Sequence, residues 1–196
     1  LHSLPRLRQR YPLIDAFSTP RLDSDIPLIG FGAHRGVTYE NVLRPAAAAK
    51  VAFEDKIPKA LLMYSNCSTL SRRERYIVPL LRQFPSLVDN KGECWEGSGG
   101  ENDAYRWTGA AEKMELLPRY MFAFAMENSY IKDWVTEKVY QALAAGVIPI
   151  YKGAPNAQRD FIPCEKCVIY VDDFPQPKDL AAHLTLLASN KDAYEA

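Results

Sequence analysis

The stretch from Met121 to Gly153 constrains the fold more than any other part of the chain. It opens with the mostly apolar residues 121–126, a run with the length of a buried strand, and closes with a second such run, 147–151. Between the two runs, apolar residues at positions 135, 139 and 143 repeat with the spacing of one helix face, and Gly146 ends the pattern. This order of strand, helix and strand predicts a right-handed βαβ unit with parallel strands.

Polar residues cluster where the first of these strands passes into the helix. Glu127 and Asn128 end the strand. Thr136 is a hydroxyl residue that can cap the helix beginning with Glu137 and Lys138. The N–H groups of a helix start and the charge of Lys138 favour a phosphate, and Glu137 can accept hydrogen bonds from two sugar hydroxyls. Because ligands of open α/β sheets bind at the carboxyl ends of the strands, the pattern predicts a sugar-nucleotide site; the alternative is a solvated first helical turn.

The remainder of the chain continues the alternation of strands and helices. We expect strands at 60–64, 87–88 and 168–171, helices at 71–83, 110–120 and 177–189, and a helix-prone segment at 46–54. Residues 1–44 are expected to be irregular because prolines interrupt them repeatedly. The sequence thus predicts an α/β fold in which residues 46–196 form a Rossmann-like nucleotide-binding domain. Residues 1–45 would be the end of a preceding domain and the segment between the two.

Several blocks of the sequence resemble a known family, the α1,3/1,4-fucosyltransferases of glycosyltransferase family 10, which use GDP-fucose. The central block reads Glu127-Asn128-Ser129, then VTEK at 135–138 and AGVIP at 145–149. In the same order as in the family, FIP, VDDF and PKDL follow at 161–163, 171–174 and 177–180. Upstream, Ser65-Asn66-Cys67 precedes Arg72, Arg73 and Tyr76, and RLDSDIP stands at 21–27. The resemblance therefore covers the chain from about residue 18 to its end, in many ordered blocks.

The resemblance implies a GT-B glycosyltransferase with two facing Rossmann-like domains, the carboxyl-terminal one holding GDP-fucose. Fucose would pass to a glycan acceptor with inversion, as an acceptor hydroxyl deprotonated by a carboxylate attacks the anomeric carbon and GDP leaves. The resemblance favours Arg72 as the guanidinium that binds the diphosphate bidentately, with Arg73 as the alternative, since family members differ by one residue in spacing here. Trp134 stands where a tyrosine is commoner, which preserves stacking but not a phenol hydrogen bond. The positions that match the donor-binding pattern are Ser65, Asn66, Arg72, Asn128, Trp134, Glu137 and Lys138.

The same resemblance leaves the catalytic residue unassigned. The family's general-base glutamate precedes the block at 21–27, but no matching glutamate stands there, and Asp15 is in the wrong context. We expect this chain alone to bind GDP and to transfer fucose poorly or not at all. No cofactor is expected to be required, although a divalent ion could stimulate the reaction. The expected acceptor is an N-glycan or lactosamine-type glycan, and the expected location is the Golgi lumen, with a type II membrane anchor outside this chain.

The chain also contains a D-x-D pattern, Asp23-Ser24-Asp25, which many other glycosyltransferases use to hold a divalent metal. Here it follows Ser-Thr-Pro-Arg-Leu and not an apolar strand, so no rigid element aims its oxygens at one point. We expect Asp23 and Asp25 to bond to backbone or to Arg21. The three histidines are isolated from one another in the sequence, and no metal site is predicted.

Four cysteines allow three disulfide pairings. Cys67 and Cys94 each follow a predicted strand, so parallel strands could bring them together, which favours Cys67–Cys94 and Cys164–Cys167. Zinc is the competing interpretation, but the two pairs lie far apart in sequence and no histidine is near. A thioredoxin-like role is disfavoured because the C-x-x-C precedes a strand. Paired cysteines would indicate an oxidising secretory compartment, and the sequon Asn66-Cys67-Ser68 is expected to stay unmodified within the crevice.

Composition excludes some functions and leaves two alternatives open. Lysine plus arginine and aspartate plus glutamate both number 24, so the chain lacks the basic excess of a nucleic-acid-binding protein. No apolar run approaches the roughly 20 residues that span a bilayer, and residues 1–10 are too basic for a signal peptide. The alternatives to a GDP-fucose-dependent enzyme are a catalytically silent nucleotide- or glycan-binding module and a GT-B transferase that uses another nucleotide sugar.

Overall fold

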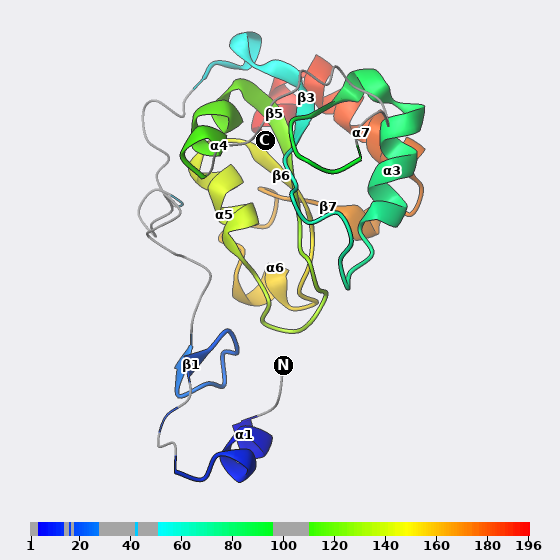
Figure 1. The fold of residues 1–196 in the computed structure, drawn as a ribbon. Helices are drawn as coiled ribbons and strands as arrows, with labels where there is room; N and C mark the ends of the chain where they lie inside the picture. Colours follow the sequence, from blue (N-terminus) through cyan, green and yellow to red (C-terminus); the bar gives the residue numbers. More distant parts are fainter. Residues whose placement is uncertain (1–3, 14–15, 17, 28–41, 43–50, 96–109) are drawn as a thin grey trace.

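The structure is a computed structural model that describes residues 4–13, 16, 18–27, 42, 51–95 and 110–196. Its centre is a five-stranded sheet in which every neighbouring pair of strands is parallel, in the order β4-β3-β5-β6-β7 (Figure 1). The parallel sheet predicted from the alternation of strands and helices is confirmed. The strands are β3 Ile57–Leu62, β4 Val88–Asn90, β5 Tyr120–Met126, β6 Ile148–Lys152 and β7 Ile169–Tyr170.

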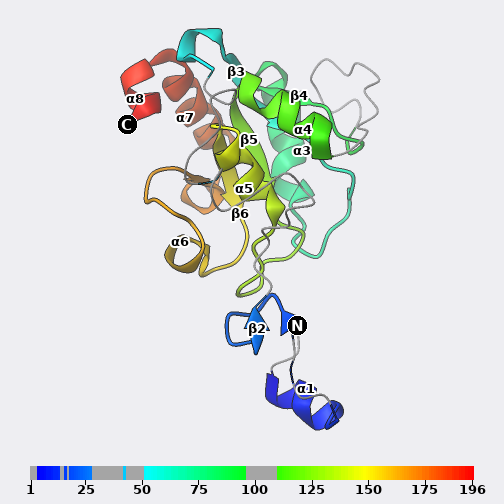
Figure 2. The ribbon, with the colours of Figure 1, turned by 90° about the vertical axis from the view of Figure 1, so that its left-hand side faces the viewer.

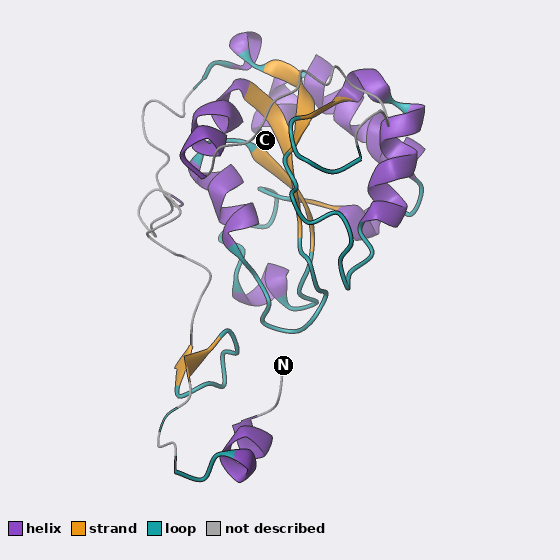
Figure 3. Cartoon of the chain, viewed as in Figure 1, coloured by secondary structure: helices purple, strands orange, loops and turns teal. Residues whose placement is uncertain are grey.

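Helices cover both faces of the sheet, which gives three layers (Figure 3). On one face α3 and α7 pack beside each other, and on the other lie α4 and α5, which are nearest the viewer in Figure 2. None of the helices in the described ranges is long and apolar enough to cross a membrane. The helices are α1 Leu4–Arg10, α3 Glu74–Gln83, α4 Ala110–Leu116, α5 Glu137–Ala144, α6 Ala157–Asp160, α7 Pro177–Ser189 and α8 Lys191–Glu195.

The central strand β5 is buried along its whole length, and the side chains on one of its faces are larger than those on the other. Phe122 and Phe124 point into a core shared with α3 and α7. Ala123 and Ala125 pack on the opposite side, in clusters that contain residues of α5. Small side chains on that face let α5 lie close to the strand, which fixes the start of the helix relative to the strand tip.

The end of α5 shows why the predicted βαβ unit forms where it does. Gly146 has φ 66°, a left-handed conformation that glycine adopts without steric cost. The N–H of Gly146 donates to the carbonyl of Leu143 and that of Val147 to the carbonyl of Ala142, both at 3.0 Å. These are the two bonds of a Schellman motif, which closes a helix and turns the chain into the next strand. The predicted role of Gly146 as helix terminator is confirmed.

Several expected boundaries are wrong. The strand expected at 60–64 is β3 at Ile57–Leu62, and three other differences have a local reason. Residues 4–10 form helix α1, because Pro5 stands in its first turn, where the missing N–H costs no hydrogen bond. The helix expected at 71–83 begins only at Glu74, since Arg72 has φ 50°. The helix expected at 110–120 ends at Leu116 and is followed by a 3₁₀ turn and β5. Most of the helix-prone segment 46–54 lies outside the described residues, and Phe53–Asp55 is a 3₁₀ turn.

Opposite the carboxyl ends of the strands, a buried lysine joins three segments. The Lys56 ammonium donates to the carbonyls of Pro118 at 3.0 Å, Gly146 at 3.2 Å and Tyr120 at 3.4 Å. Burial lowers the pKa of this amine, because the charged form loses solvation. Three carbonyl partners compensate for that loss, so Lys56 ties the segment before β3 to the start of β5 and to the end of α5.

One buried and three partly buried tyrosines predict how the stability of the protein changes at high pH. Burial raises the pKa of Tyr76, Tyr130 and Tyr170 to about 12 and that of Tyr64 still further. Because the folded pKa values exceed the unfolded value of 10, this contribution to stability is complete below pH 10 and is lost as pH rises toward 12. We expect chemical-denaturation midpoints to fall above about pH 10, with tyrosinate absorbance appearing together with unfolding. Full ionisation of these tyrosines near pH 10 in the folded protein would contradict this.

Candidate functional site

The candidate site lies at the carboxyl edge of the sheet, where the loops after β3, β5 and β6 meet. The loop after β3 carries Ser65 and Asn66, both exposed. It is joined to the loop after β5 by the N–H of Ser71, which donates to the carbonyl of Asn128 at 3.0 Å. Residues from distant parts of the sequence thus meet at the edge where open α/β sheets bind ligands.

At the tip of β5, Glu127 forms the centre of a polar cluster with the start of α5. Its carboxylate accepts the N–H of Thr136 at 2.7 Å, and both its oxygens lie within 2.9 Å of the Thr136 hydroxyl. The Lys138 ammonium donates to the same carboxylate at 3.2 Å and to the Thr136 hydroxyl at 2.8 Å. Burial raises the pKa of the Glu127 carboxyl, and Lys138 and Thr136 offset part of that rise. The cluster sets one cation at the first turn of the helix.

Thr136 occupies the predicted cap position but does not cap with its side chain. It is the N-cap residue of α5, and its hydroxyl bonds to Glu127 and Lys138 and not to an amide of the first turn. The prediction of a side-chain cap by Thr136 is therefore wrong. The amides at the start of α5 receive no bond from this side chain, which suits an anion at that end of the helix.

Glu137 and Lys138, both predicted site residues, come together at the start of α5. Lys138 Nζ lies 3.5 Å from Glu137 Oε1, and the side chains keep 13% and 19% of their surface exposed. Both are thus largely shielded while still reaching solvent. A partly shielded ammonium interacts more strongly with a phosphate than a fully solvated one does, because the local dielectric is lower.

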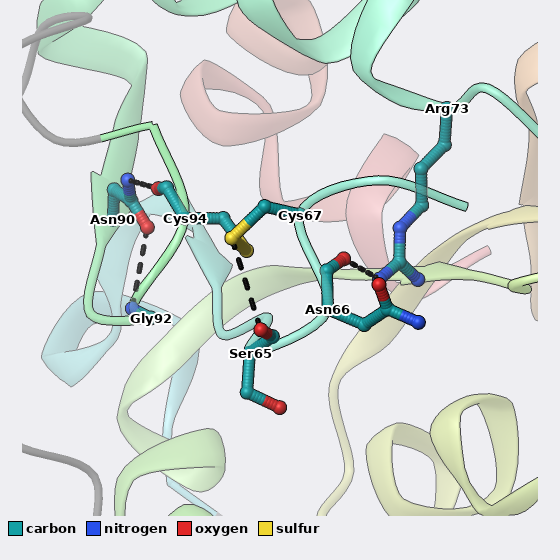
Figure 4. Close-up of a disulfide and its surroundings, with 7 residues drawn as sticks. All are labelled: Ser65, Asn66, Cys67, Arg73, Asn90, Gly92 and Cys94. Carbon is teal, nitrogen blue, oxygen red and sulfur yellow. Dashed lines mark hydrogen bonds between the residues drawn. A yellow bond between two sulfur atoms is a disulfide. The ribbon is translucent and has the colours of Figure 1, made fainter.

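The two adjacent arginines have different positions. Arg73 is buried, with its guanidinium carbon 3.6 Å from the centre of the Tyr64 ring. Its two terminal nitrogens donate to the carbonyls of Met126 at 2.7 Å and Asn66 at 2.9 Å, the latter visible in Figure 4. Arg72 is exposed and has a left-handed backbone. Arg73 therefore lies at the strand tips, while Arg72, the favoured diphosphate ligand, lies on the surface of the same loop.

A disulfide holds the loop after β3 against the loop after β4. Cys67 is bonded to Cys94, and Cys164 to Cys167, the pairing that the sequence favoured. Figure 4 shows Cys67 directly after Ser65 and Asn66. On the other side, the side-chain amide of Asn90 donates to the carbonyl of Cys94 at 2.7 Å. The loop that carries two predicted site residues is thus anchored at its middle.

The loop from β5 to α5 is anchored in a similar way. Asp133 is buried with φ 67°, its N–H donates to Asn156 Oδ1 at 2.9 Å, and its carboxylate accepts Asn156 Nδ2 at 2.8 Å. This exchange ties the residue before Trp134 to the loop after β6. It fixes the path of the chain into α5.

Two of the predicted residues carry buried polar atoms without a hydrogen-bond partner in the structure, Asn128 Oδ1 and Trp134 Nε1. Buried polar atoms are normally paired, so each unpaired one needs an explanation, and a ligand that supplies the partner is one such explanation. One atom is an acceptor and the other a donor. They therefore suit a ligand that carries both kinds of group, as a nucleotide sugar does.

Sequence reasoning missed two polar residues at this edge, Tyr130 and Lys152. Tyr130 follows β5, and burial raises the pKa of its phenol to about 12. Lys152 ends β6, forms an ion pair with Asp172 and lies 5.3 Å from the Tyr130 ring. Lys152 could have been found from its place at the end of a predicted strand, whereas nothing in the sequence pairs it with Asp172.

The D-x-D segment does not gather its carboxylates. Arg21 donates to Asp23 at 2.7 Å, as expected, but Asp25 pairs with Arg8 at 2.6 Å and not with Arg21. Ser24 is buried and bonds to Thr19. Within the described part of the chain, no group of three or more potential metal-ligating side chains comes together. Asp15 lies outside that part.

Comparison with known proteins agrees with this geometry. Residues 53–196 match the family described as glycosyltransferase family 10 (fucosyltransferase), C-terminal part. The chain is 34% identical over 140 residues to alpha-(1,3)-fucosyltransferase B of Drosophila melanogaster, covering 69% of this chain and 31% of the relative. It is 33% identical over 132 residues to GDP-fucose protein O-fucosyltransferase 3 of Xenopus laevis, covering 66% and 28%.

A solved structure is similar as well. The crystal structure of an alpha1,3-fucosyltransferase with GDP-fucose matches with a TM-score of 0.51 and 27% identity, over 76% of this chain and 38% of the other. The chain thus spans about a third of the length of the relatives that it matches. The family match nevertheless extends over most of the chain, including β3 to β7 and every residue of the predicted donor site. This chain therefore belongs to glycosyltransferase family 10, the fucosyltransferases.

Proposed function

We propose that this chain forms the GDP-fucose-binding part of an inverting fucosyltransferase. Family membership supports the reaction class, and the solved relative with GDP-fucose supports the donor. The observation that carries the proposal is the Lys138 ammonium, held at the first turn of α5 beside the tip of β5. A cation and a helix N-terminus at one point are suited to a diphosphate.

In this proposal the residues of the site act mainly on the leaving group. As the bond between fucose and the diphosphate breaks, negative charge grows on the departing GDP. Lys138 and the amides at the start of α5 stabilise that charge, which lowers the barrier. Glu137 accepts hydrogen bonds from hydroxyls of the donor. The general base that deprotonates the acceptor is not assigned. The proposal requires no metal or other cofactor, although a divalent ion could stimulate the reaction.

Two acceptor classes follow from the relatives. An N-glycan or lactosamine-type glycan is the acceptor expected from the sequence, and the 1,3 linkage in the name of the relative alpha-(1,3)-fucosyltransferase B supports transfer to a sugar. A protein hydroxyl fits the relatives named GDP-fucose protein O-fucosyltransferase 3, one of them at 33% identity. Joined to the upstream part of its own protein, the chain would be assayed with GDP-fucose against both acceptors. The linkage formed, either to a sugar or directly to a protein side chain, decides between the two.

Both disulfides support a location for the protein in an oxidising compartment, and we propose the Golgi lumen. Microscopy of the tagged full-length protein with a Golgi marker tests this. Cytosolic staining, together with free thiols at Cys67 and Cys94 in the purified protein, would contradict it.

Calorimetric titration with GDP tests the donor proposal. Arg72→Ala removes the exposed guanidinium predicted to grip the diphosphate, a charged contact worth about 1.5 to 3 kcal/mol, and should raise the GDP dissociation constant at least about ten-fold. The matched control is Arg82→Ala, which removes an exposed arginine from the last turn of α3 and should leave the constant unchanged. An unchanged constant for Arg72→Ala removes that residue from the site. Preference of the wild type for UDP or ADP over GDP would contradict the proposed donor.

A further inference from the structure

Glu127 is fully enclosed at the tip of β5, yet its side-chain partners all belong to the segment where α5 begins. Its own N–H donates to the carbonyl of Lys152 at 2.8 Å, which continues the pairing of β5 with β6 and fixes its backbone. The space beside it depends on Gly153, because a Cβ at that position would lie 2.8 Å from Glu127 Cγ. The chain thus builds a close-fitting enclosure around one carboxylate.

A carboxylate is costly to bury, and it is tolerated only where donors replace its hydration. Glu127 receives three such donors, the N–H and hydroxyl of Thr136 and the ammonium of Lys138. All three donors come from the N-cap and first turn of α5, so these contacts set the position of the helix start relative to the tip of β5. The contacts of Glu127 therefore serve to align Thr136 and Lys138 more than to stabilise the packing of the core.

We propose that Glu127 is a positioning residue, which holds Thr136 and Lys138 so that the start of α5 and the ammonium are directed together at the diphosphate of the bound donor. This inference rests on the proposed function. Glu127 keeps the Thr136 hydroxyl away from the first-turn amides, which leaves them for the ligand. It also restricts a lysine side chain that has four rotatable bonds, so less entropy is lost when the phosphate binds.

A double-mutant cycle with Glu127→Gln and Lys138→Met tests the proposal. Each single variant should raise the GDP dissociation constant about ten-fold, because Lys138→Met removes the cation and Glu127→Gln removes the carboxylate that positions it. The double variant should bind GDP no more weakly than Lys138→Met alone, since Glu127 acts through Lys138. Guanosine, which has no phosphates, should bind the wild type and both single variants equally. A residue with a merely structural role would weaken guanosine and GDP alike.

Thr136→Val provides a second route if Glu127→Gln does not fold. It removes the hydroxyl shared by Glu127 and Lys138 while leaving both charges in place, and it should weaken GDP binding several-fold. The matched control is Thr185→Val, which removes a hydroxyl that bonds only within α7 and should have no effect.

The outcomes separate the two proposals. Wild-type protein that does not bind GDP overturns the proposed function and this inference with it. Wild-type protein that binds GDP and loses affinity in Lys138→Met, but not in Glu127→Gln or Thr136→Val, overturns this inference alone. Additive losses in the double variant also overturn it, because Glu127 would then act independently of Lys138.

Discussion

Arg73→Ala should lower the free energy of unfolding by about 3 kcal/mol and abolish GDP binding by the folded fraction. The Arg73 guanidinium stacks on the Tyr64 ring and donates to two carbonyls, those of Met126 and Asn66. Loss of a buried, charged donor leaves both carbonyls short of a partner and forfeits the cation–π contact, which together justify that magnitude. Denaturant titration gives the stability, and calorimetry gives the affinity for GDP.

For the stability part of that prediction, Arg72→Ala is the matched control. The two arginines are adjacent and chemically identical, but Arg72 is exposed and its left-handed backbone would be shared by the alanine. We expect the free energy of unfolding of Arg72→Ala to stay within about 0.5 kcal/mol of the wild-type value. Equal destabilisation by the two substitutions would show that the stacked, doubly bonded position of Arg73 does not contribute to folding as described.

The sequence predicted the parts of the fold that depend on local patterns. Each pattern indicated the element in which it lies. The apolar run indicated strand β5, the spacing of Val139 and its apolar neighbours indicated helix α5, and Gly146 indicated the end of that helix. Helix α7 was expected at 177–189, where it is found, because a proline marks its start and its leucines repeat with helical spacing. Such patterns depend on a few neighbouring residues, so they predict an element without knowledge of the tertiary structure.

Features that depend on distant parts of the chain could not be predicted. Thr136 has the chemistry of a capping residue, but Glu127, nine positions earlier, competes for its hydroxyl and its N–H once the strand and helix pack together. Which of the two arginines points inward is decided by the left-handed backbone at Arg72, for which neither residue gives a signal. Long-range packing therefore overrode the local preference at both places.

The candidate site likewise contains residues that local patterns predicted and residues that only the fold brings together. Lys138 and Glu137 were identified from their place at the start of a helix that follows a strand. By contrast, the contact of Tyr64 with Arg73 and the pairing of Lys152 with Asp172 required knowledge of the fold, in which β3 and β6 lie on either side of β5. The proposed donor site thus consists of residues that are adjacent only because three parallel strands end at one edge.

Gly92→Ala should also be strongly destabilising, by about 3 kcal/mol or more. A Cβ at Gly92 would lie 2.3 Å from the backbone nitrogen of Tyr64 and 2.6 Å from its carbonyl oxygen. The chain around it is fixed, since Lys91 donates to the carbonyl of Leu62 at 2.8 Å and Glu93 to that of Tyr64 at 2.9 Å. Backbone atoms held in this way cannot move aside as a flexible side chain would, so the loop must detach from β3.

The consequence should extend to the site, because the loop that contains Gly92 also carries Cys94, the partner of Cys67. Displacement of this loop would shift the segment of Ser65 and Asn66, so Gly92→Ala should weaken GDP binding as well as lower the melting temperature. Gly146→Ala is the matched control: its left-handed φ of 66° makes alanine cost about 1 to 2 kcal/mol, at the opposite edge of the sheet from the site. Thermal unfolding and GDP titration of both variants check this. If the Gly92→Ala protein were as stable as Gly146→Ala and bound GDP with wild-type affinity, the close approach of this loop to β3 would be required neither for stability nor for GDP binding.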